Sequence, residues 1–292
     1  MRELSYVSAN DPAWKRWTIA AIEDLSGRRR YLPLYRRWIA EGGNGGPKFA
    51  QALKLIGVDL TIASEGPWPP PIAAETPLVM IANHPFGIAD GISALAIAEE
   101  LGRPFRVLIN NDLLKVPEIR PYSLPIDFSE TRAAQEMNLA SRAEARRLLK
   151  EGVTIIVFPA GGVATAANPF GRAEELPWKT FTARLVQLSE ASVLPVYFAG
   201  QNSALFHLVS RMSLTLRLSL LVSEFRYFRN MAYTARVGRV VPYAEFDNRV
   251  DRRKLTDEMY VHVHRLAPWA KGLDEAALRP LPADKRPAYP WD

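Results

Sequence analysis

Short apolar runs alternate with longer amphipathic stretches through the middle of the chain. Four runs predict buried strands: Leu78–Ala82, Phe105–Ile109, Thr154–Phe158 and Val193–Phe198. Three stretches with helical spacing predict helices: Ala89–Leu101, Thr131–Lys150 and Trp178–Glu190. Strands that are apolar throughout and joined by helices are typical of parallel sheets covered on both faces. The pattern predicts an α/β fold, with a mostly parallel central sheet flanked by helices and an N-terminal helical segment.

The pattern is less regular on either side of this region. Residues 1–57 have mostly helical spacing, a strand is expected at Val58–Ala63, and residues 67–72 form a stiff proline-rich link. A further strand is expected at Met231–Val240 and a closing helix at Arg252–Leu266. Three parts are predicted: a helical segment that could face a membrane (1–72), an α/β domain (73–272) and a proline-rich tail (273–292).

Composition narrows the class of protein. The chain has 292 residues, 48% of them hydrophobic, which is enough for one large domain. It has no cysteine, and this excludes disulfides and thiolate metal sites. We expect no signal peptide, and no stretch approaches the ~20 apolar residues of a spanning helix. The expectation is a protein that is soluble or lies on a membrane surface.

The net charge of +6 favours an anionic partner. Between Leu205 and Arg239 there are six arginines and a single acid, Glu224, among bulky apolar residues. This mixture suits a membrane interface, although an ordinary amphipathic helix explains it equally well. The candidate membrane contacts are Arg211, Arg217, Arg226 and Arg229. Nucleic-acid binding is the weaker explanation, because no recognised nucleic-acid motif is present.

A polar cluster follows the first predicted strand of the α/β region. Asn83 and His84 come directly after Leu78–Ala82, and Asp90 lies early in the next predicted helix. Ligands bind at the carboxyl edge of parallel sheets, where these residues are expected. Asp90 could accept one imidazole N–H and leave the other nitrogen of His84 as a base. A lone histidine at a strand end is more often structural, but these polar neighbours favour catalysis.

A pair of glycines follows the third of these strands. Gly161 and Gly162 could present backbone N–H groups to an oxyanion, although an ordinary turn would use the same residues. The chain lacks Gly-x-Ser-x-Gly and the Gly-Lys-Ser/Thr of a phosphate-binding loop. We therefore expect His84 to act directly on an acceptor hydroxyl or amine. His262 and His264 lack a third metal ligand, so we interpret them as surface or packing residues.

The two sites in this order resemble the glycerolipid acyltransferases, also called lysophospholipid acyltransferases. That family carries Asn-His-x4-Asp, then Phe-Pro-Glu-Gly-Thr-Arg-Ser roughly seventy residues later, then a Val-Pro-Val-like strand. The counterparts here are Asn83-His84 with Asp90, Phe158–Gly162 and Val193–Val196. The resemblance covers residues 75–245 and looks closest to a haemolysin-like bacterial branch that includes enzymes of ornithine-lipid synthesis. The stretches similar to that branch are Pro85–Gly87, Ile126–Phe128, Pro177–Lys179 and Gly200–Ser203.

The resemblance implies an O-acyltransferase that works at a membrane surface. His84 would deprotonate a lyso-lipid acceptor, and Asp90 would orient His84. Backbone N–H groups near Gly161 and Gly162, supported by Asn83, would stabilise the oxyanion, and such a donor contributes ~3–4 kcal/mol. The acyl donor would be a thioester of acyl carrier protein or coenzyme A, with no metal or other cofactor. The implied location is the cytoplasmic face of a bacterial inner membrane, as a peripheral protein.

The spacing of the histidine motif departs from the family pattern. Five residues rather than four separate His84 from Asp90. We expect a bulge at Gly87 to absorb the extra residue, because glycine tolerates backbone conformations that other residues avoid. Without such a bulge the two side chains would not meet.

The residues expected to bind the acceptor also differ. Ala160 and Val163 stand near the places of the motif glutamate and arginine, and Phe128 replaces an arginine that binds the acceptor phosphate in the family. These losses argue against lysophosphatidic acid and favour an amino-acid lipid such as lyso-ornithine lipid. The candidate acceptor contacts are Arg172, Lys179 and Asn202, although Lys179 could equally be a solvated first-turn lysine. The alternative function is a catalytically degenerate relative that binds lipid.

Overall fold

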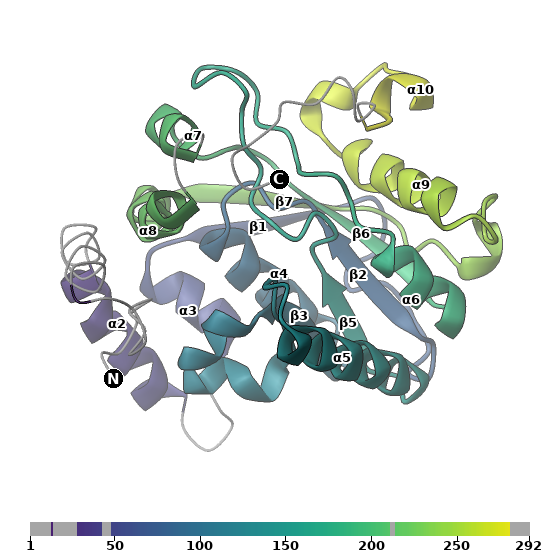
Figure 1. Ribbon diagram of the computed structural model, residues 1–292, viewed down its shortest axis with the longest axis horizontal. Helices are drawn as coiled ribbons and strands as arrows, with labels where there is room; N and C mark the ends of the chain where they lie inside the picture. Colours follow the sequence, from purple (N-terminus) through teal and green to yellow (C-terminus); the bar gives the residue numbers. More distant parts are fainter. Residues whose placement is uncertain (1–12, 14–27, 43–47, 211–213, 281–292) are drawn as a thin grey trace.

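A seven-stranded sheet forms the centre of the computed structural model, which describes residues 13, 28–42, 48–210 and 214–280 (Figure 1). The strands are β1 Asp59–Ser64, β2 Leu78–Ala82, β3 Phe105–Asn110, β4 Ser123–Ile126, β5 Thr154–Val157, β6 Ser192–Phe198 and β7 Ala232–Val237. Their order is β1-β7-β6-β2-β5-β3-β4. Every neighbouring pair is parallel except β6 and β7. The predicted fold class is confirmed.

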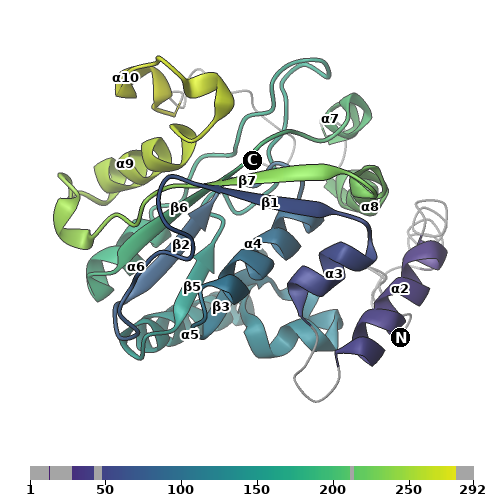
Figure 2. The ribbon, with the colours of Figure 1, turned by 180° about the vertical axis from the view of Figure 1, so that it is seen from behind.

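Helices cover both faces of this sheet. The α-helices are α2 Arg28–Glu41, α3 Phe49–Leu55, α4 Ile88–Glu100, α5 Arg132–Lys150, α6 Phe181–Ser189, α7 Ala204–Ser210, α8 Leu214–Phe225, α9 Arg252–His264 and α10 Glu275–Leu278. Short 3₁₀ helices span Asn111–Lys115, Pro117–Tyr122, Arg226–Phe228, Tyr243–Glu245 and Pro268–Ala270. Helices α5, α6 and α9 cover one face (Figure 1), and α2, α3 and α4 lie on the other (Figure 2).

The central strand β2 shows why the sequence forms these layers. All five of its residues are buried. Val79 and Ile81 pack with the α5, α6 and α9 side chains, whereas Leu78 and Met80 pack with those of α3 and α4. Successive strand residues point to opposite faces, so a strand covered on both faces must be apolar at every position. Burying each such side chain contributes roughly 1.5–3 kcal/mol.

The edges of the sheet differ from what the sequence predicted. β1 pairs in parallel with β7 along its whole length, from Asp59 to Ser64, so the sheet begins before the expected boundary at residue 73. β4 was not predicted, because it has four residues and includes Pro125. Proline cannot donate to a strand ladder and is found mainly at sheet edges, which is where β4 lies.

The described part of the N-terminal segment packs against the α/β body. Tyr31 of α2 is buried, with its ring 5.3 Å from that of Phe225 in α8. Trp38 is also buried and donates its indole N–H to the Lys48 carbonyl. Within the described residues, no helix is long and apolar enough to span a bilayer. Residues 1–12 and 14–27 of the expected helical segment, and 281–292 of the expected tail, lie outside the described residues.

Candidate active site

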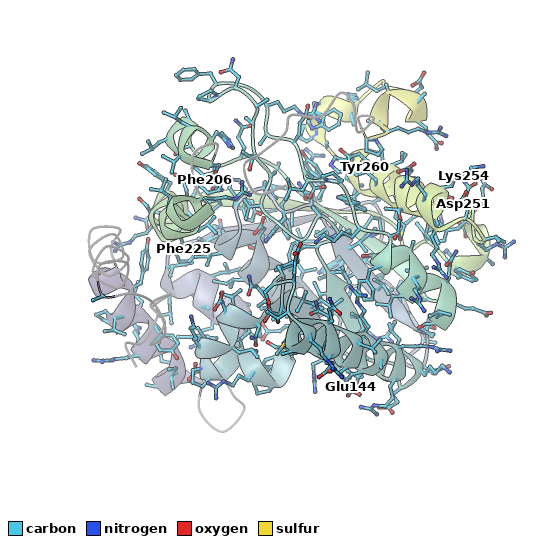
Figure 3. The ribbon with its side chains drawn as sticks, viewed as in Figure 1. Glu144, Phe206, Phe225, Asp251, Lys254 and Tyr260 are labelled. Atoms are coloured by element: carbon cyan, nitrogen blue, oxygen red, sulfur yellow. The ribbon has the colours of Figure 1, made fainter. Side chains whose placement is uncertain are left out.

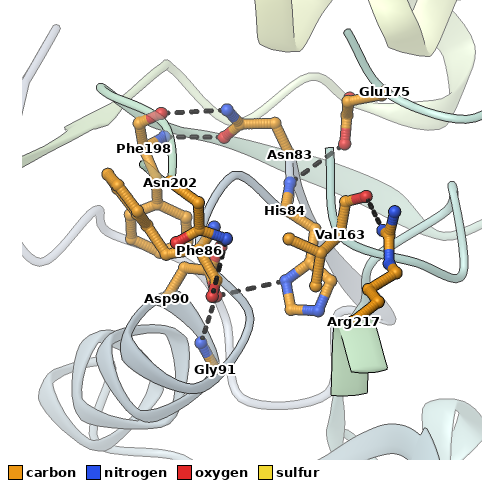
Figure 4. A network of polar contacts seen from close by, with 10 residues as sticks. All are labelled: Asn83, His84, Phe86, Asp90, Gly91, Val163, Glu175, Phe198, Asn202 and Arg217. Atoms are coloured by element: carbon orange, nitrogen blue, oxygen red, sulfur yellow. Dashed lines mark hydrogen bonds and ion pairs between the residues drawn. The ribbon is translucent and has the colours of Figure 1, made fainter. Parts of the chain in front are cut away.

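Asn83 fixes the point where the chain leaves β2. Its side chain is 5% exposed, donates to the Phe198 carbonyl over 2.9 Å and accepts from the Phe198 N–H over 2.6 Å. These two bonds join the carboxyl ends of β2 and β6 (Figure 4). The Asn83 amide therefore supports the framework, and its oxygen is committed to the backbone instead of facing a reacting group.

A glycine turn brings His84 and Asp90 together despite the extra residue between them. Gly87 has φ of +89° and accepts the Gly91 N–H at its carbonyl, so α4 begins immediately after it. A side chain at residue 87 would lie 3.1 Å from both Leu221 and Val163. The result is a separation of 3.2 Å between His84 Nδ1 and Asp90 Oδ1. The predicted proximity is confirmed, with Gly87 at the turn as expected.

The Asp90 carboxylate is held rigidly. It is fully buried and accepts N–H groups from Phe86 and Gly91, each over 2.9 Å (Figure 4). A buried carboxylate requires such donors. The His84 side chain is 18% exposed and its ring lies 4.2 Å from that of Phe158. The Nδ1–Oδ1 contact has an ion-pair distance without hydrogen-bond alignment, and catalytic pairs often tighten only when substrate binds.

The loop after β5 runs beside His84. Ala164 donates its N–H to the His84 carbonyl over 2.8 Å, which attaches the loop to the histidine. The N–H of Gly161 donates to the Phe158 carbonyl over 3.0 Å and closes a turn. This corrects the expectation that Gly161 offers a free oxyanion donor. Among the hydrogen bonds of the described residues, none uses the N–H of Gly162, so Gly162 stays a candidate donor.

The position of Arg217 corrects the prediction that this residue contacts the membrane. Its side chain is buried, with 3% exposure, and donates to the Val163 carbonyl and the Thr165 hydroxyl. Its guanidinium also lies 5.3 Å from the Phe206 ring centroid. Because this side chain points into the protein, it cannot contact lipid headgroups. Its contacts attach α8 to the loop that borders His84 (Figure 4).

The other three candidate membrane arginines have different outcomes. Arg211 and the side chain of Arg226 lie outside the described part of the chain. Arg229 is exposed in the turn before β7. Its membrane contact stays a prediction.

The three candidate acceptor contacts lie in different surroundings. The Lys179 ammonium is 4.9 Å from the Phe128 ring centroid, and a side chain at Gly161 would come within 3.6 Å of its Nζ. Burial, with the nearby charge of Arg142, lowers the pKa of Lys179. The Arg172 guanidinium stacks 3.4 Å from the Trp269 ring centroid. Of the three, Lys179 lies beside the glycine turn.

Asn202 is less accessible than a substrate contact should be. It is 4% exposed, and its Nδ2 is 3.5 Å from the Phe86 carbonyl, next to the Asp90 turn. Figure 4 shows Asn202 beside Phe86 and Asp90, where it supports the turn between β2 and α4. A direct acceptor contact would need this side chain to become exposed, so the structure does not favour that prediction.

Glu175 is a site residue that the sequence did not reveal. Its carboxylate accepts the backbone N–H of His84 over 2.9 Å and the indole N–H of Trp178 over 2.9 Å. Burial raises the pKa of Glu175 to about 7. His264 of α9 lies on its other side, with Nε2 3.4 Å from Oε2. The only sequence signal for Glu175 was its place just before the Pro177–Lys179 stretch.

The site therefore lies between α8 and α9, which contribute Arg217 and His264. Figure 3 shows the α7–α8 region, marked by Phe206 and Phe225, away from α9, marked by Tyr260. Among the described residues, no three His, Asp or Glu side chains are grouped as a metal site requires. The partly exposed His84 and the buried Asp90, at the carboxyl edge of a parallel sheet, define a candidate site for acid–base chemistry.

The comparisons with known proteins identify the family. Residues 56–235, more than half of the chain, match the family model described as Acyltransferase. This chain belongs to that acyltransferase family. The matched residues include both halves of the candidate site, from His84 to Glu175. The resemblance to acyltransferases drawn from the sequence is confirmed at this level, whereas the ornithine-lipid branch receives no specific support.

Two curated relatives and one solved structure are similar to the chain. The lyso-glycine lipid O-acyltransferase of Phocaeicola vulgatus is 27% identical over 180 residues, covering 57% of this chain and 60% of that protein. The lyso-glycine lipid O-acyltransferase of Bacteroides thetaiotaomicron is 28% identical over 178 residues, covering 57% of this chain and 61% of that protein. The aligned region thus spans about three fifths of each relative.

The solved structure is the 1-acyl-sn-glycerophosphate (LPA) acyltransferase PlsC from Thermotoga maritima. It is 15% identical, with a TM-score of 0.45, and the match covers 87% of this chain and 92% of that one. A likeness this distant supports no assignment of activity.

Proposed function

We propose that the chain transfers a fatty acyl group from a thioester to the hydroxyl of a lyso-lipid. The observation that carries the proposal is the His84–Asp90 pair, with Nδ1 and Oδ1 3.2 Å apart and the carboxylate held by two backbone N–H groups. Asp90 faces Nδ1, so Nε2 is the nitrogen left to accept a proton. Membership of the acyltransferase family and the two lyso-glycine lipid O-acyltransferase relatives support this reaction class.

In the proposed reaction His84 Nε2 takes the proton of the acceptor hydroxyl. The hydroxyl oxygen forms a bond to the thioester carbonyl carbon, and the N–H of Gly162 is the candidate donor to the resulting oxyanion. When the intermediate collapses, the carbon–sulfur bond breaks and the proton passes from the His84 imidazolium to the thiolate. The products are an ester and a free thiol, and no covalent acyl-enzyme is needed. Acyl carrier protein and coenzyme A are both proposed as donor carriers.

We propose an acceptor whose headgroup carries a carboxylate, as in an N-acylated amino acid. Lys179 is the group that favours this choice, because it lies beside the glycine turn and no carboxylate of the described residues pairs with it. Lyso-glycine lipid and lyso-ornithine lipid both satisfy this requirement. The relatives' names favour testing the glycine lipid first.

We further propose that the enzyme works as a peripheral protein at the cytoplasmic face of a bacterial inner membrane. Leu205 and Leu208 of α7 are 57% and 47% exposed, and Tyr227 in the following 3₁₀ helix is 60% exposed. Arg229 is exposed close to Tyr227 in the sequence. Exposed apolar side chains near a cation suit an interface with anionic lipid.

The test is acyl transfer by the purified full-length chain, with acyl-carrier-protein or coenzyme A thioester and lyso-glycine or lyso-ornithine lipid in anionic vesicles. Product formation is measured by mass spectrometry for wild type and His84→Ala. We expect a diacylated lipid only from wild type. A wild-type chain that binds the vesicles but yields no product from any pairing would favour the catalytically degenerate lipid-binding relative.

A further inference from the structure

A carboxylate that the proposed reaction does not use lies directly behind His84. The Glu175 side chain is 5% exposed. Its Oε1 accepts the His84 backbone N–H over 2.9 Å (Figure 4). Its Oε2 accepts the indole N–H of Trp178, also over 2.9 Å. Since a buried carboxylate is costly without donors, these bonds fix its position. Glu175 thereby anchors the backbone from which the imidazole projects.

The second partner of Glu175 comes from the end of α9. His264 is buried, with Nδ1 3.0 Å from the Tyr260 carbonyl and Nε2 3.4 Å from Glu175 Oε2. A carbonyl only accepts, so Nδ1 carries a proton. Nε2 therefore faces the Glu175 carboxylate at an ion-pair distance.

Burial favours the neutral form of both Glu175 and His264. It raises the pKa of Glu175 to about 7 and lowers the pKa of His264 to about 4. The titratable and charged groups around the pair come from several elements: His84, Asp90, Tyr197, Tyr260 and Arg172. The charge of Asp90 raises the pKa of Glu175 further, and that of His84 lowers it. Asp90 thus contacts the ring of His84, and Glu175 contacts its backbone N–H.

We infer that Glu175 is a positioning residue for His84, which fixes its backbone and, when ionised, adds a second negative charge beside the imidazolium formed during transfer. This inference rests on the proposed function, in which His84 is the base. The neutral imidazole of His84 gains a proton from the acceptor and becomes an imidazolium, and Asp90 and Glu175 then stabilise its charge from two sides. Neutral Glu175 retains the backbone bond but loses the electrostatic contribution.

The test compares wild type with Glu175→Gln in the full chain. Glutamine keeps the shape and can still accept the His84 N–H, but it carries no charge. The measurement is kcat/KM for acyl transfer to lyso-glycine lipid in anionic vesicles from pH 5.5 to 9. At pH 8.5 we expect wild type to be about tenfold faster, because the ionised carboxylate stabilises the imidazolium that forms only during transfer, and a nearby opposite charge favours the charged form of a group by about one pKa unit or more. That ratio should shrink as the pH falls below 7, where wild-type Glu175 becomes neutral.

Glu174→Gln is the matched control, since Glu174 is an exposed neighbour and its variant should follow wild type at every pH. A Glu175→Gln rate equal to wild type, or lower by one constant factor at all pH values, would overturn the electrostatic role. If Glu175→Gln does not fold, Glu175→Asp replaces it. That variant keeps the charge, so we expect a lower kcat/KM that still falls below pH 7 as it does in wild type. A kcat/KM that no longer falls below pH 7 would contradict the inference.

His84→Ala separates this inference from the function on which it rests. A His84→Ala variant that retains near-wild-type transfer would overturn the proposed base itself. Loss of transfer in His84→Ala, combined with wild-type behaviour of Glu175→Gln, would overturn only the role of Glu175.

Discussion

The guanidinium of Arg217 donates a hydrogen bond to the carbonyl of Val163. The next residue, Ala164, donates its N–H to the His84 carbonyl. A cation buried in α8 thus supports the loop that lies against the candidate base. The same guanidinium donates to the Thr165 hydroxyl. These bonds make Arg217 part of the framework of the site, at 3% exposure.

The first prediction concerns this buried guanidinium. Arg217→Met keeps an unbranched side chain but removes the guanidinium that donates to the Val163 carbonyl and the Thr165 hydroxyl. We expect the free energy of unfolding to fall by about 2–4 kcal/mol, measured by denaturant titration, because the variant loses buried hydrogen bonds from a charged donor. Arg229→Met, at an exposed position, should change stability by no more than about 0.5 kcal/mol. Equal stability of the two variants would contradict the structural role.

The second prediction concerns Asp90. Asp90→Asn preserves the shape of a fully buried side chain but removes the charge that faces His84 Nδ1. We expect kcat for acyl transfer to fall about 10²–10⁴-fold, the range typical of general base catalysis. Asp112→Asn, at an exposed aspartate outside the site, should have wild-type kcat. A near-wild-type kcat for Asp90→Asn would show that the carboxylate does not assist the base.

The third prediction concerns Lys179 and the headgroup of the acceptor. Lys179→Ala should raise KM for a carboxylate-bearing lyso-lipid about tenfold, since a hydrogen bond to a charged group contributes roughly 1.5–3 kcal/mol. Its effect on kcat should be small, because the ammonium would contact the headgroup and not the reacting atoms. Lys150→Ala, at the exposed end of α5, is the control for general loss of positive charge. Matching changes in KM would contradict a headgroup contact by Lys179.

The sequence predicted the layers of the fold better than the contacts around the site. β2 was predicted because each of its five residues is apolar, whereas β4 is too short and contains Pro125. The approach of Asp90 to His84 followed from a local motif and a glycine. The inward direction of Arg217 did not, because arginines interspersed with leucines suit either face of a helix. Glu175 meets His84 only through the folded chain, and no local pattern records that contact.

The fourth prediction concerns the dependence of stability on pH. Because folding raises the pKa of Glu175 from 4.5 to about 7, the folded state binds more protons in this interval and Glu175 makes stability fall as the pH rises. Folding lowers the pKa of His264 from 6.5 to about 4, so His264 makes stability rise with pH between these values. The two effects oppose each other across most of the window.

Glu175→Gln removes only the falling contribution. We expect the free energy of unfolding of this variant to rise more steeply than that of wild type between pH 4.5 and 7, measured by denaturant titration at fixed ionic strength. The difference between the two curves should change by an amount on the order of 3 kcal/mol across the window. Parallel curves would mean that Glu175 does not titrate in this range.

The last prediction concerns the exposed apolar face of α7. Leu205 and Leu208 are three residues apart on one helix face, at 57% and 47% exposure. Each leucine buried in the acyl region contributes roughly 1.5–3 kcal/mol, so Leu205→Glu with Leu208→Glu should reduce co-sedimentation with anionic vesicles at least about tenfold. Leu139→Glu is the matched control, because Leu139 is 67% exposed on α5. A double variant that still binds vesicles like wild type, or a control that loses binding equally, would place the docking face elsewhere.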